Sequence, residues 1–366
     1  MSPALRIGIV GAGLAGLAMA LTASSAGATV EVFDAPATAP SKATHLHVTA
    51  NLLRDLNSLG LADSCVRKGF PYKGMVVADV QGRAYCELAS PRLAGEPLPP
   101  ALGMVHGDLL GLLRQAAVDR GAKLHQGTTI VDALPDATLV TQAGERHPMD
   151  LAVLTNRPGS AGTLRSALVA WEPEALPQQW CQTLVPRPLA LDRATLVLSH
   201  EYPKVLLVPV DTRRAGVAVM WNERSRPSTS DIRQVLAAQG GIVAPVARHW
   251  GATTPVTERP VRFGMQPGPW HAQRVLRIGP AALVLPPHFG QQAAQSVEDA
   301  LVLGDLLRAR LPHDELLHAF EARRLDRARR VLEITSQAAR WNVRPDASTD
   351  LLALAERLVP LVARPA

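Results

Sequence analysis

Cysteine is scarce in this chain: only Cys65, Cys86 and Cys181 occur among 366 residues. The three are far apart, their number is odd, and none belongs to a CxxC pair or a Cys/His cluster. This pattern excludes a disulfide framework and a cysteine-ligated metal site as organising features. We therefore expect three reduced thiols in a cytoplasmic protein that has no metal site.

Lysine and aromatic residues are also few, and this composition argues against some classes of binding partner for a positively charged protein. The formal net charge is +6, yet only five residues are lysine, so the excess is arginine. The densest basic run, residues 323–330, repeats its arginines at helical spacing and contains no aromatic residue. Nucleic-acid sites usually combine basic and aromatic residues in a recognisable module. We therefore expect a solvated helix face there and no nucleic-acid partner.

Long uninterrupted hydrophobic runs are missing as well. The apolar stretch 7–26 is interrupted by glycines and leads into a strand, which is not the pattern of a signal peptide. No other stretch approaches the roughly 18 uncharged residues that a membrane span needs. We therefore expect no membrane association. The amphipathic stretch 350–363 is expected to pack on its own domain or on a second copy of the chain, as in a homodimer.

What the sequence does contain begins with a βαβ pattern in residues 6–34. The run RIGIV at residues 6–10 is short, apolar and β-branched, as in a buried parallel strand. A glycine-rich turn and an alanine- and leucine-rich helix to about Ala26 follow, and TVEVFD at residues 29–34 gives a second strand. The two strands should be parallel and joined by a right-handed crossover.

The glycines of this turn have the spacing of a dinucleotide site. Gly11 allows the tight turn after the strand, Gly13 lets a pyrophosphate approach the backbone, and Gly16 lets helix and strand pack closely. Asp34 ends the second strand, where an acidic side chain can accept hydrogen bonds from an adenosine ribose. Because the turn lies between a strand and a helix, a dinucleotide site is a better interpretation than a purely structural turn.

The rest of the chain alternates between helical stretches and proline-rich stretches of alternating strands. We expect an α/β fold in which a Rossmann-like dinucleotide-binding domain is interleaved with a mostly antiparallel β-sheet substrate domain and followed by C-terminal helices. The expected boundaries are 1–70, 101–165 and 274–335 for the first domain, 71–100 and 166–273 for the second, and 336–366 for the C-terminal segment.

Three further segments carry a family resemblance. They are NLLRDLNSLGL at 51–61, VHGDLLGLLRQAA at 105–117 and GPAALVLPPHFGQQAAQSVEDA at 279–300. In them the chain resembles the single-component (class A) FAD-dependent aromatic hydroxylases, the family of para-hydroxybenzoate hydroxylase. The resemblance spans nearly the whole chain. It implies FAD as cofactor, reduced pyridine nucleotide as hydride donor and hydroxylation of a small aromatic or polycyclic substrate, in specialised metabolism.

The last of these segments aligns without a gap with the family pattern GDAAHxxxPxxGQGxNxxxEDA. Pro287, Gly290 and Gln291 fall in register, and the resemblance places them, together with Gln292, at the flavin. Two of the departures from the pattern fall on positions that contact the cofactor in the family. Pro280 replaces the aspartate that binds the ribityl chain, and Gln292 replaces a glycine that lets backbone N–H groups approach the flavin. These changes indicate an atypical FAD site.

Other family positions differ too. Gly107 replaces an arginine near the FAD pyrophosphate, and Ala35 replaces the arginine that often follows the second strand. Residues 154–165 (LTNRPGSAGTLR) match the second dinucleotide motif clearly only at Arg165, although Asn156 can stand in for its aspartate. Direct use of NAD(P)H therefore stays open, and an external flavin reductase is the alternative source of reduced flavin.

Three histidines are candidate catalytic residues, because imidazole titrates near neutral pH. His288 follows Pro287 in the loop that faces the flavin in the family, and His45 and His47 fall nearby by analogy. A packing or surface role is equally compatible with each. Besides an FAD-dependent monooxygenase, two hypotheses remain: a flavin-free enzyme performing cyclisation, dehydration or isomerisation through these histidines, and a non-catalytic binding protein.

Overall fold

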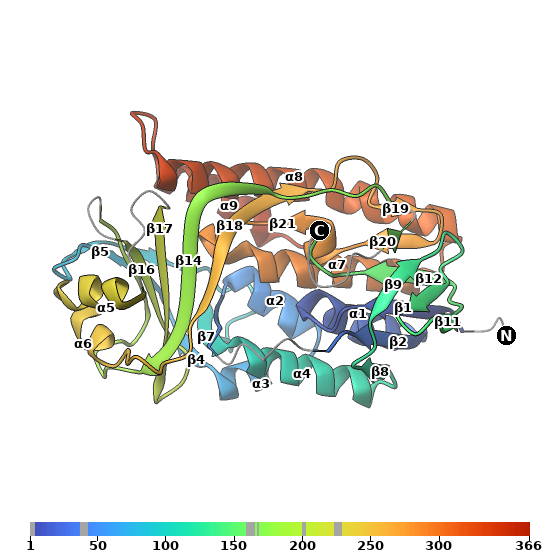
Figure 1. Cartoon of the computed structure of the whole chain (residues 1–366), viewed down its shortest axis with the longest axis horizontal. Coiled ribbons are helices and arrows are strands. Elements are labelled where there is room, and N and C mark those ends of the chain that lie inside the picture. Colours follow the sequence, from blue (N-terminus) through green and yellow to red (C-terminus); the bar gives the residue numbers. More distant parts are fainter. Residues whose placement is uncertain (1–3, 37–42, 159–164, 167, 200–202, 223–228) are drawn as a thin grey trace. The chain divides into compact units, whose positions relative to one another are not determined.

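The computed structural model describes residues 4–36, 43–158, 165–166, 168–199, 203–222 and 229–366. The chain folds into two compact units, which are described separately here (Figure 1). Unit 1 comprises Met1–Ala39, Leu110–Glu174 and Arg262–Ala366. Unit 2 comprises Pro40–Leu109 and Ala175–Val261.

The centre of unit 1 is a mostly parallel sheet. Its strands, in spatial order, are β19 (His271–Ala272), β20 (Val275–Arg277), β12 (Leu151–Leu154), β1 (Arg6–Val10), β2 (Thr29–Asp34) and β8 (Lys123–Gln126). All neighbours pair in parallel except β19, which is antiparallel to β20. Strand β12 is buried throughout and β1 is buried after its first residue, as expected for parallel strands covered on both faces.

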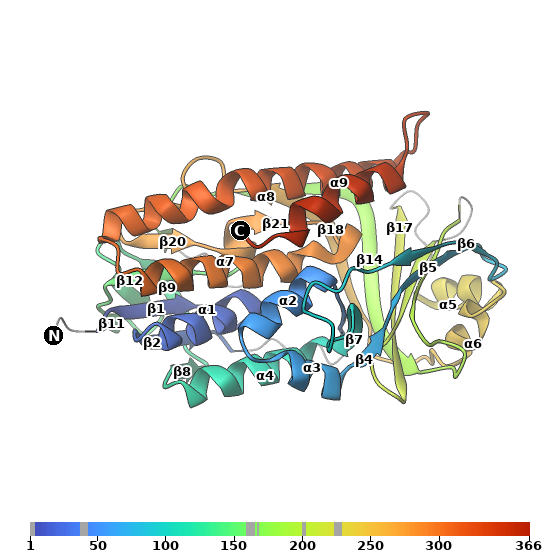
Figure 2. The same cartoon turned by 180° about the vertical axis from the view of Figure 1, so that it is seen from behind.

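Helices complete unit 1. They are α1 (Leu14–Ser25), most of α4 (His106–Asp119), α7 (Gln291–Arg308), α8 (His313–Val343) and α9 (Leu351–Ala363). Helix α7 packs along α1, where Thr22 Oγ1 donates to Ala300 O over 3.0 Å and Gly304 lets the helices approach. Helix α8 runs along α7, and α9 packs on α8 with its apolar face buried (Figure 2). The amphipathic C-terminal stretch thus packs on its own unit.

A second, smaller sheet also belongs to unit 1. It contains β11 (Arg146–His147), β10 (Leu139–Thr141), β9 (Ile130–Ala133) and β13 (Arg165–Ser166). Leu139 and Met149 lie so close to Gly8 that a Cβ on this glycine would be 2.7 Å from Leu139 Cδ1. The small sheet therefore packs directly on β1, which explains the glycine within that strand.

The large sheet of unit 2 is mostly antiparallel. Its order is β18 (Thr257–Met265), β14 (Glu174–Pro186), β17 (Arg214–Asn222), β16 (Lys204–Pro209), β15 (Ala194–Val197), β5 (Gly74–Ala78) and β6 (Ala84–Ala89). Only β15 and β5 pair in parallel among the pairs from β14 to β6. The unit boundaries fall inside β14 and β18, and the last residues of β18 pair with β21 (Leu283–Val284) in unit 1.

Different elements pack on the two faces of this sheet. Helices α5 (Thr229–Ala237) and α6 (Val243–Arg248) enclose a core that includes Trp221 and Trp250. A three-stranded sheet of β3 (His45–Val48), β7 (Ala101–Val105) and β4 (Phe70–Tyr72) encloses a second core. Helices α2 (Ala50–Ser58) and α3 (Ala62–Lys68) connect β3 to β4.

The fold class expected from the sequence is confirmed: a parallel Rossmann-like sheet, a mostly antiparallel sheet and C-terminal helices are all present. The compact units divide the chain differently from the expected domains. Residues 40–70 and 101–109 belong to unit 2, because β3, β4 and β7 pair with one another there, and 336–366 belongs to unit 1. The functional division between dinucleotide and substrate domains stays a prediction.

Within the described residues, no helix combines the length and the apolar character needed to cross a membrane.

Candidate functional site

The strand order of unit 1 reverses direction next to β1. The chain leaves β1 through α1 and returns to β2 on one side, whereas β12 lies on the other side. The carboxyl ends of these parallel strands share one edge of the sheet. In open α/β sheets a ligand binds at such a switch point, outside the carboxyl ends of the strands. The three glycines after β1 and Asp34 at the end of β2 both lie at this edge.

The glycine turn between β1 and α1 is closely packed at Gly11 and Gly16 and open at Gly13. Gly11 has φ +103°, and a Cβ on it would lie 2.1 Å from Asn156 Oδ1. A Cβ on Gly16 would lie 1.8 Å from Gly11 O, so helix and turn touch there. By contrast, a Cβ on Gly13, the N-terminal capping position of α1, would meet no atom of the described residues within 4 Å. Gly13 therefore faces open space, as a phosphate-binding glycine should.

Asp34 lies beside this turn. Its Oδ1 accepts a hydrogen bond from the Ala12 N–H over 3.1 Å, and the Gly11 N–H donates to Phe33 O over 2.8 Å. The carboxylate is thereby tied to the turn by one of its oxygens. An ionised carboxylate has further lone pairs, so Asp34 can still accept ribose hydroxyl groups.

The residues that follow β12 hold the turn from the other side of the switch point. Thr155 Oγ1 donates to Val10 O over 2.8 Å, and the Thr155 N–H donates to the same oxygen over 3.1 Å. Asn156, which the sequence suggested as a substitute for the family aspartate, packs its amide oxygen against Gly11. The role of Thr155 was not predicted, because no local pattern marks it.

A second loop, residues 279–292, lies against the first turn of α1. A Cβ on Gly279, whose φ is +55°, would be 2.5 Å from Ala15 Cβ. The Gly279 N–H donates to Asp299 Oδ2 over 2.8 Å, and Pro280 follows within a short 3₁₀ helix. Proline has no N–H to donate. The start of this loop therefore uses its donor internally.

The end of the second loop contains the residues that the family resemblance placed at the flavin. Pro287 precedes a 3₁₀ turn at His288–Gly290, and Gly290 takes φ +63° just before α7. Phe289 also has a positive φ of 60°, which is uncommon for a residue with a side chain. Gln291 is the buried first residue of α7. Two consecutive left-handed residues thus set the direction in which α7 begins.

Gln292 folds back onto its own loop. Its Oε1 accepts the Leu285 N–H over 2.8 Å, and its Nε2 donates to Leu283 O over 3.1 Å. The side-chain amide thus behaves like an additional peptide group alongside residues 283–285. Glycine, the family residue at this position, could not make either bond.

A buried ionic cluster supports this loop from behind. Arg324 of α8 is fully buried and bonds Asp299 Oδ1 and Glu298 Oε2, both over 2.6 Å, and Gln295 Oε1 over 2.8 Å. Arg327 bonds both oxygens of Glu298. Because Asp299 also accepts the Gly279 N–H, the cluster connects α8 to the second loop through α7.

The remaining candidates, His45 and His47, lie on β3 in unit 2, whereas His288 belongs to unit 1. His45 is buried against Gly216, and neither of its ring nitrogens has a hydrogen-bond partner. Burial, together with the charge of His47, lowers the pKa of His45 to about 3. Burial also lowers the pKa of His47 to about 4. Both imidazoles are therefore neutral near pH 7.

Tyr72 is a partner of His47 that the sequence did not suggest. The Tyr72 hydroxyl and His47 Nδ1 are 2.6 Å apart, and the two rings stack with centroids 5.8 Å apart. Burial raises the pKa of Tyr72, so the phenol stays protonated and can donate to the neutral imidazole. His47 and Tyr72 lie on β3 and β4, which both pair with β7, and this tertiary pairing is what brings them together.

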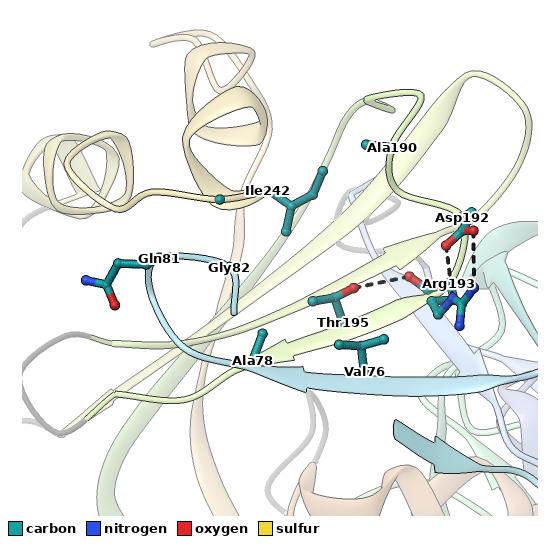
Figure 3. Close-up of a pocket in the computed structure, with 10 residues that line it drawn as sticks. Val76, Ala78, Gln81, Gly82, Ala190, Asp192, Arg193, Thr195 and Ile242 are labelled. Atoms are coloured by element: carbon teal, nitrogen blue, oxygen red, sulfur yellow. Dashed lines mark hydrogen bonds and ion pairs between the residues drawn. The ribbon is translucent and has the colours of Figure 1, made fainter. Parts of the chain in front are cut away.

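A surface hollow of 270 Å³ lies elsewhere in unit 2 (Figure 3). Val76, Ala78 and Thr195 form its floor on the large sheet, and Gly82 and Gly241 approach each other at one wall. Its two charged side chains, Asp192 and Arg193, pair with each other over 3.0 Å. The hollow contains none of the residues singled out from the sequence.

The first loop fits the adenosine diphosphate half of a dinucleotide, because it offers open space at Gly13 and a carboxylate at Asp34. The second loop does not present the ribityl and flavin contacts of the family pattern. Pro280 offers neither a donor nor a side-chain acceptor, and Gln292 covers the backbone of Leu283 and Leu285. The site therefore fits one half of FAD better than the other.

Comparisons with known proteins also indicate an FAD-binding domain. Residues 4–148 match the family described as FAD binding domain. The chain is 28% identical over 357 residues to 3-amino-4-hydroxybenzoate 2-monooxygenase PtmB3 of Streptomyces platensis, covering 89% of this chain and 85% of the relative.

Solved structures share the fold over almost the whole chain. The crystal structure of a variant of 2-methyl-3-hydroxypyridine-5-carboxylic acid oxygenase superposes with a TM-score of 0.85 at 18% identity, covering 100% of this chain and 99% of that one. Klebsiella pneumoniae HpxO complexed with FAD and uric acid gives 0.79 at 20% identity, covering 98% and 92%. With the glycine turn, Asp34 and the segment 279–300, these matches lead to one conclusion: residues 4–148 form a domain of the FAD-binding type, and the chain as a whole is similar to FAD-dependent monooxygenases.

Proposed function

We propose that this protein is an FAD-dependent monooxygenase with an atypical cofactor site, acting on a small aromatic or polycyclic substrate. The observation that carries the proposal is the glycine turn at the switch point, where Gly13 faces open space beside Asp34. The printed names of the relatives support the substrate class. PtmB3 acts on an aminohydroxybenzoate, and the structural neighbour acts on a hydroxypyridine carboxylate.

In this proposal the chain binds and orients, and the cofactor supplies the redox chemistry. The first-turn N–H groups of α1 and the backbone at Gly13 would bind the phosphates, as helix N-termini commonly do. Asp34 would accept hydrogen bonds from the ribose. Pro287, Gly290 and Gln291 would shape the wall at the flavin end, because the left-handed residues before α7 fix the direction of that wall.

The source of reducing equivalents is part of the proposal. The segment after β12 keeps Asn156 at the turn but otherwise departs from the family's second dinucleotide motif. A separate flavin reductase that delivers reduced FAD is therefore the favoured partner over direct use of NAD(P)H. Oxidation of NADPH by the purified protein, measured with FAD and candidate substrates but without a reductase, distinguishes the two sources.

The test of the proposed function begins with an absorbance spectrum of the purified protein, followed by titration with FAD. Flavin bands near about 370 and 450 nm are expected to appear with bound FAD. Reduced FAD, oxygen and a panel of hydroxylated aromatic acids should then give a product that is heavier by one oxygen atom. A protein that binds neither oxidised nor reduced FAD would overturn the proposal.

A second candidate function, flavin-free acid–base catalysis, has one observation in its favour. Tyr72 is buried, His47 is half-buried, and the two are held at a short distance by two strands. A neutral imidazole beside a protonated phenol can accept a proton. His45 and His288 would be its other candidates. Turnover of a substrate by protein that is free of flavin, and its loss in both His47→Gln and Tyr72→Phe, would favour this function over the first.

A further inference from the structure

We infer that the site holds FAD almost entirely by its adenosine diphosphate half, so that ADP alone binds nearly as tightly as FAD. The inference rests on the proposed function, because it concerns how the same site divides its affinity along the cofactor. Two loops of unit 1 meet at the first turn of α1, and they differ in what they offer to a ligand.

In the first loop the Gly11 and Ala12 N–H groups already donate to Phe33 O and Asp34 Oδ1, and the part available to a ligand begins at Gly13. The space around Gly13 is open, and the carbonyl of Gly13 accepts the Leu17 N–H over 2.9 Å, so α1 begins immediately after the turn. The N–H groups of a helix's first turn have no partner within the helix. They point towards the switch point, where the positive end of the helix dipole favours an anion. A diphosphate is the ligand group that uses all of these features.

The second loop has already used backbone groups within residues 279–285. The Gly279 N–H donates to Asp299, Pro280 has no N–H, and the Leu285 N–H donates to Gln292. The carbonyl oxygen of Leu283 accepts from Gln292 as well. A flavin placed against this loop would have to break these bonds or do without them, so its polar ring edge gains little there.

Gln292 is the residue that most weakens the contacts offered to the flavin half of FAD. In the family pattern the residue at its position is glycine, which leaves backbone groups near the start of α7 accessible. The Gln292 side chain instead bridges Leu283 O and Leu285 N and adds bulk at the same place. The bridge is a local structure built by one side chain, and a single substitution can remove it.

The size of the effect follows from the number of contacts. A hydrogen bond between ligand and protein contributes about a tenfold change in affinity. Two or three missing flavin contacts would therefore remove about a hundredfold to a thousandfold of the advantage that FAD normally has over ADP. We expect dissociation constants for FAD and ADP that lie within about tenfold of each other.

The test is calorimetric titration of the cofactor-free full-length protein with ADP, FAD and FMN at one pH and salt concentration. Similar dissociation constants for ADP and FAD, with FMN binding at least about a hundredfold more weakly, are the expected result. An excess of ADP should also release FAD from the protein during gel filtration. FAD binding that is more than about a hundredfold tighter than ADP binding would overturn the inference but leave the proposed function intact. Binding of neither FAD nor ADP would overturn both.

Two variants sharpen the test. Gln292→Gly removes the bridge and restores the family residue, and Gln292→Ala removes it without adding glycine flexibility. Both should tighten FAD binding by about tenfold and leave ADP binding unchanged. Gln115→Ala is the matched control, because Gln115 is an exposed helical glutamine that bonds only Asp119 Oδ1 over 2.7 Å. An equal gain for ADP and FAD, or no gain for either, would contradict the role given to Gln292. If a Gln292 variant fails to fold, the titration of the unaltered protein still decides.

Discussion

The two loops that meet at the first turn of α1 differ in how much of their backbone is open to a ligand. The turn at Gly11–Gly16 lacks side chains where a ligand can come close, and its empty space is kept open by Gly13. The loop 279–292 has bonded its own backbone through Asp299 and Gln292. One loop therefore leaves space at Gly13, and the other bonds its own backbone within residues 279–285. The two loops differ in how they use their backbone groups, although both carry the family resemblance.

The largest expected effect tests what supports the second loop. Arg324→Ala should lower the free energy of unfolding by about 3–5 kcal/mol, because it leaves the buried carboxylate of Asp299 without its cation and leaves Glu298 with Arg327 alone. Urea denaturation followed by circular dichroism measures the loss. The control is Arg329→Ala, which breaks an exposed pair with Asp326 and should change stability by less than about 0.5 kcal/mol. Equal losses in both variants would contradict the structural role of the cluster.

The next largest effect is the difference in stability between alanine substitutions at Gly16, where the first loop is closely packed, and at Gly13, where it is open. Gly16→Ala should cost about 3 kcal/mol of stability, since its Cβ would lie 1.8 Å from Gly11 O. Gly13→Ala has free space for its Cβ and should leave stability within about 0.5 kcal/mol while weakening ADP binding at least tenfold. Thermal unfolding and calorimetry read the two properties separately. A destabilised Gly13→Ala protein would show that the open space does not exist.

The pH dependence of stability tests the buried histidine of unit 2. His45 has its pKa lowered to about 3 in the folded chain, whereas an unfolded histidine titrates near about 6.5. The unfolded state therefore binds more protons below pH 6.5, and stability falls as the pH falls through that window. Between pH 6.5 and pH 5 we expect a loss of about 2 kcal/mol from His45.

Urea denaturation at several pH values checks this, and His45→Gln should reduce the slope. His249→Gln, at an exposed position of the same unit, is the control and should leave the slope unchanged. Binding experiments on the two loops are best performed above pH 6.5, where this loss of stability does not interfere. A pH slope that is the same in His45→Gln as in the unaltered protein would show that another group causes it.

The smallest expected effect concerns Asp34. Asp34→Asn keeps a side-chain acceptor but removes the charge that strengthens hydrogen bonds to a ribose, so ADP and FAD should both bind about tenfold more weakly. FMN contains no adenosine ribose and should be unaffected. If Asp34→Asn weakened FAD but not ADP, the two halves of the site would have been assigned the wrong way round.

The first loop was predictable from the sequence because its chemistry is local. Three glycines, a preceding apolar strand and an acid at the end of the next strand suffice to place it, and β1 and β2 begin and end where expected. The long strand β14 was missed, because its prolines and glutamines obscure the alternation of a strand, and β18 contains a proline as well. Antiparallel pairing with β17 along nine residues overrides those local preferences in β14.

The second loop was predictable only in its register. Pro287, Gly290 and Gln291 were located by the family resemblance, and Gln292 was recognised as a departure. Its bonds to Leu283 and Leu285 depend on how the loop curves, which no residue pattern specifies. The pairing of His47 with Tyr72 was hidden for a related reason, because β3 and β4 are joined only through β7. The catalytic roles of the three histidines stay predictions.

The connection from Arg324 through Asp299 to Gly279 also has a consequence for the order in which the chain is made. The glycine turn after β1 leaves the ribosome long before the guanidinium on which its neighbouring loop depends, because Arg324 follows about three hundred residues later. Domains generally fold as units during synthesis, and incomplete ones expose apolar surface. Unit 2 contains no residue beyond Val261, whereas β20, α7 and α8 of unit 1 all follow that position. We therefore expect the glycine turn to gain its full support only after α8 has been translated.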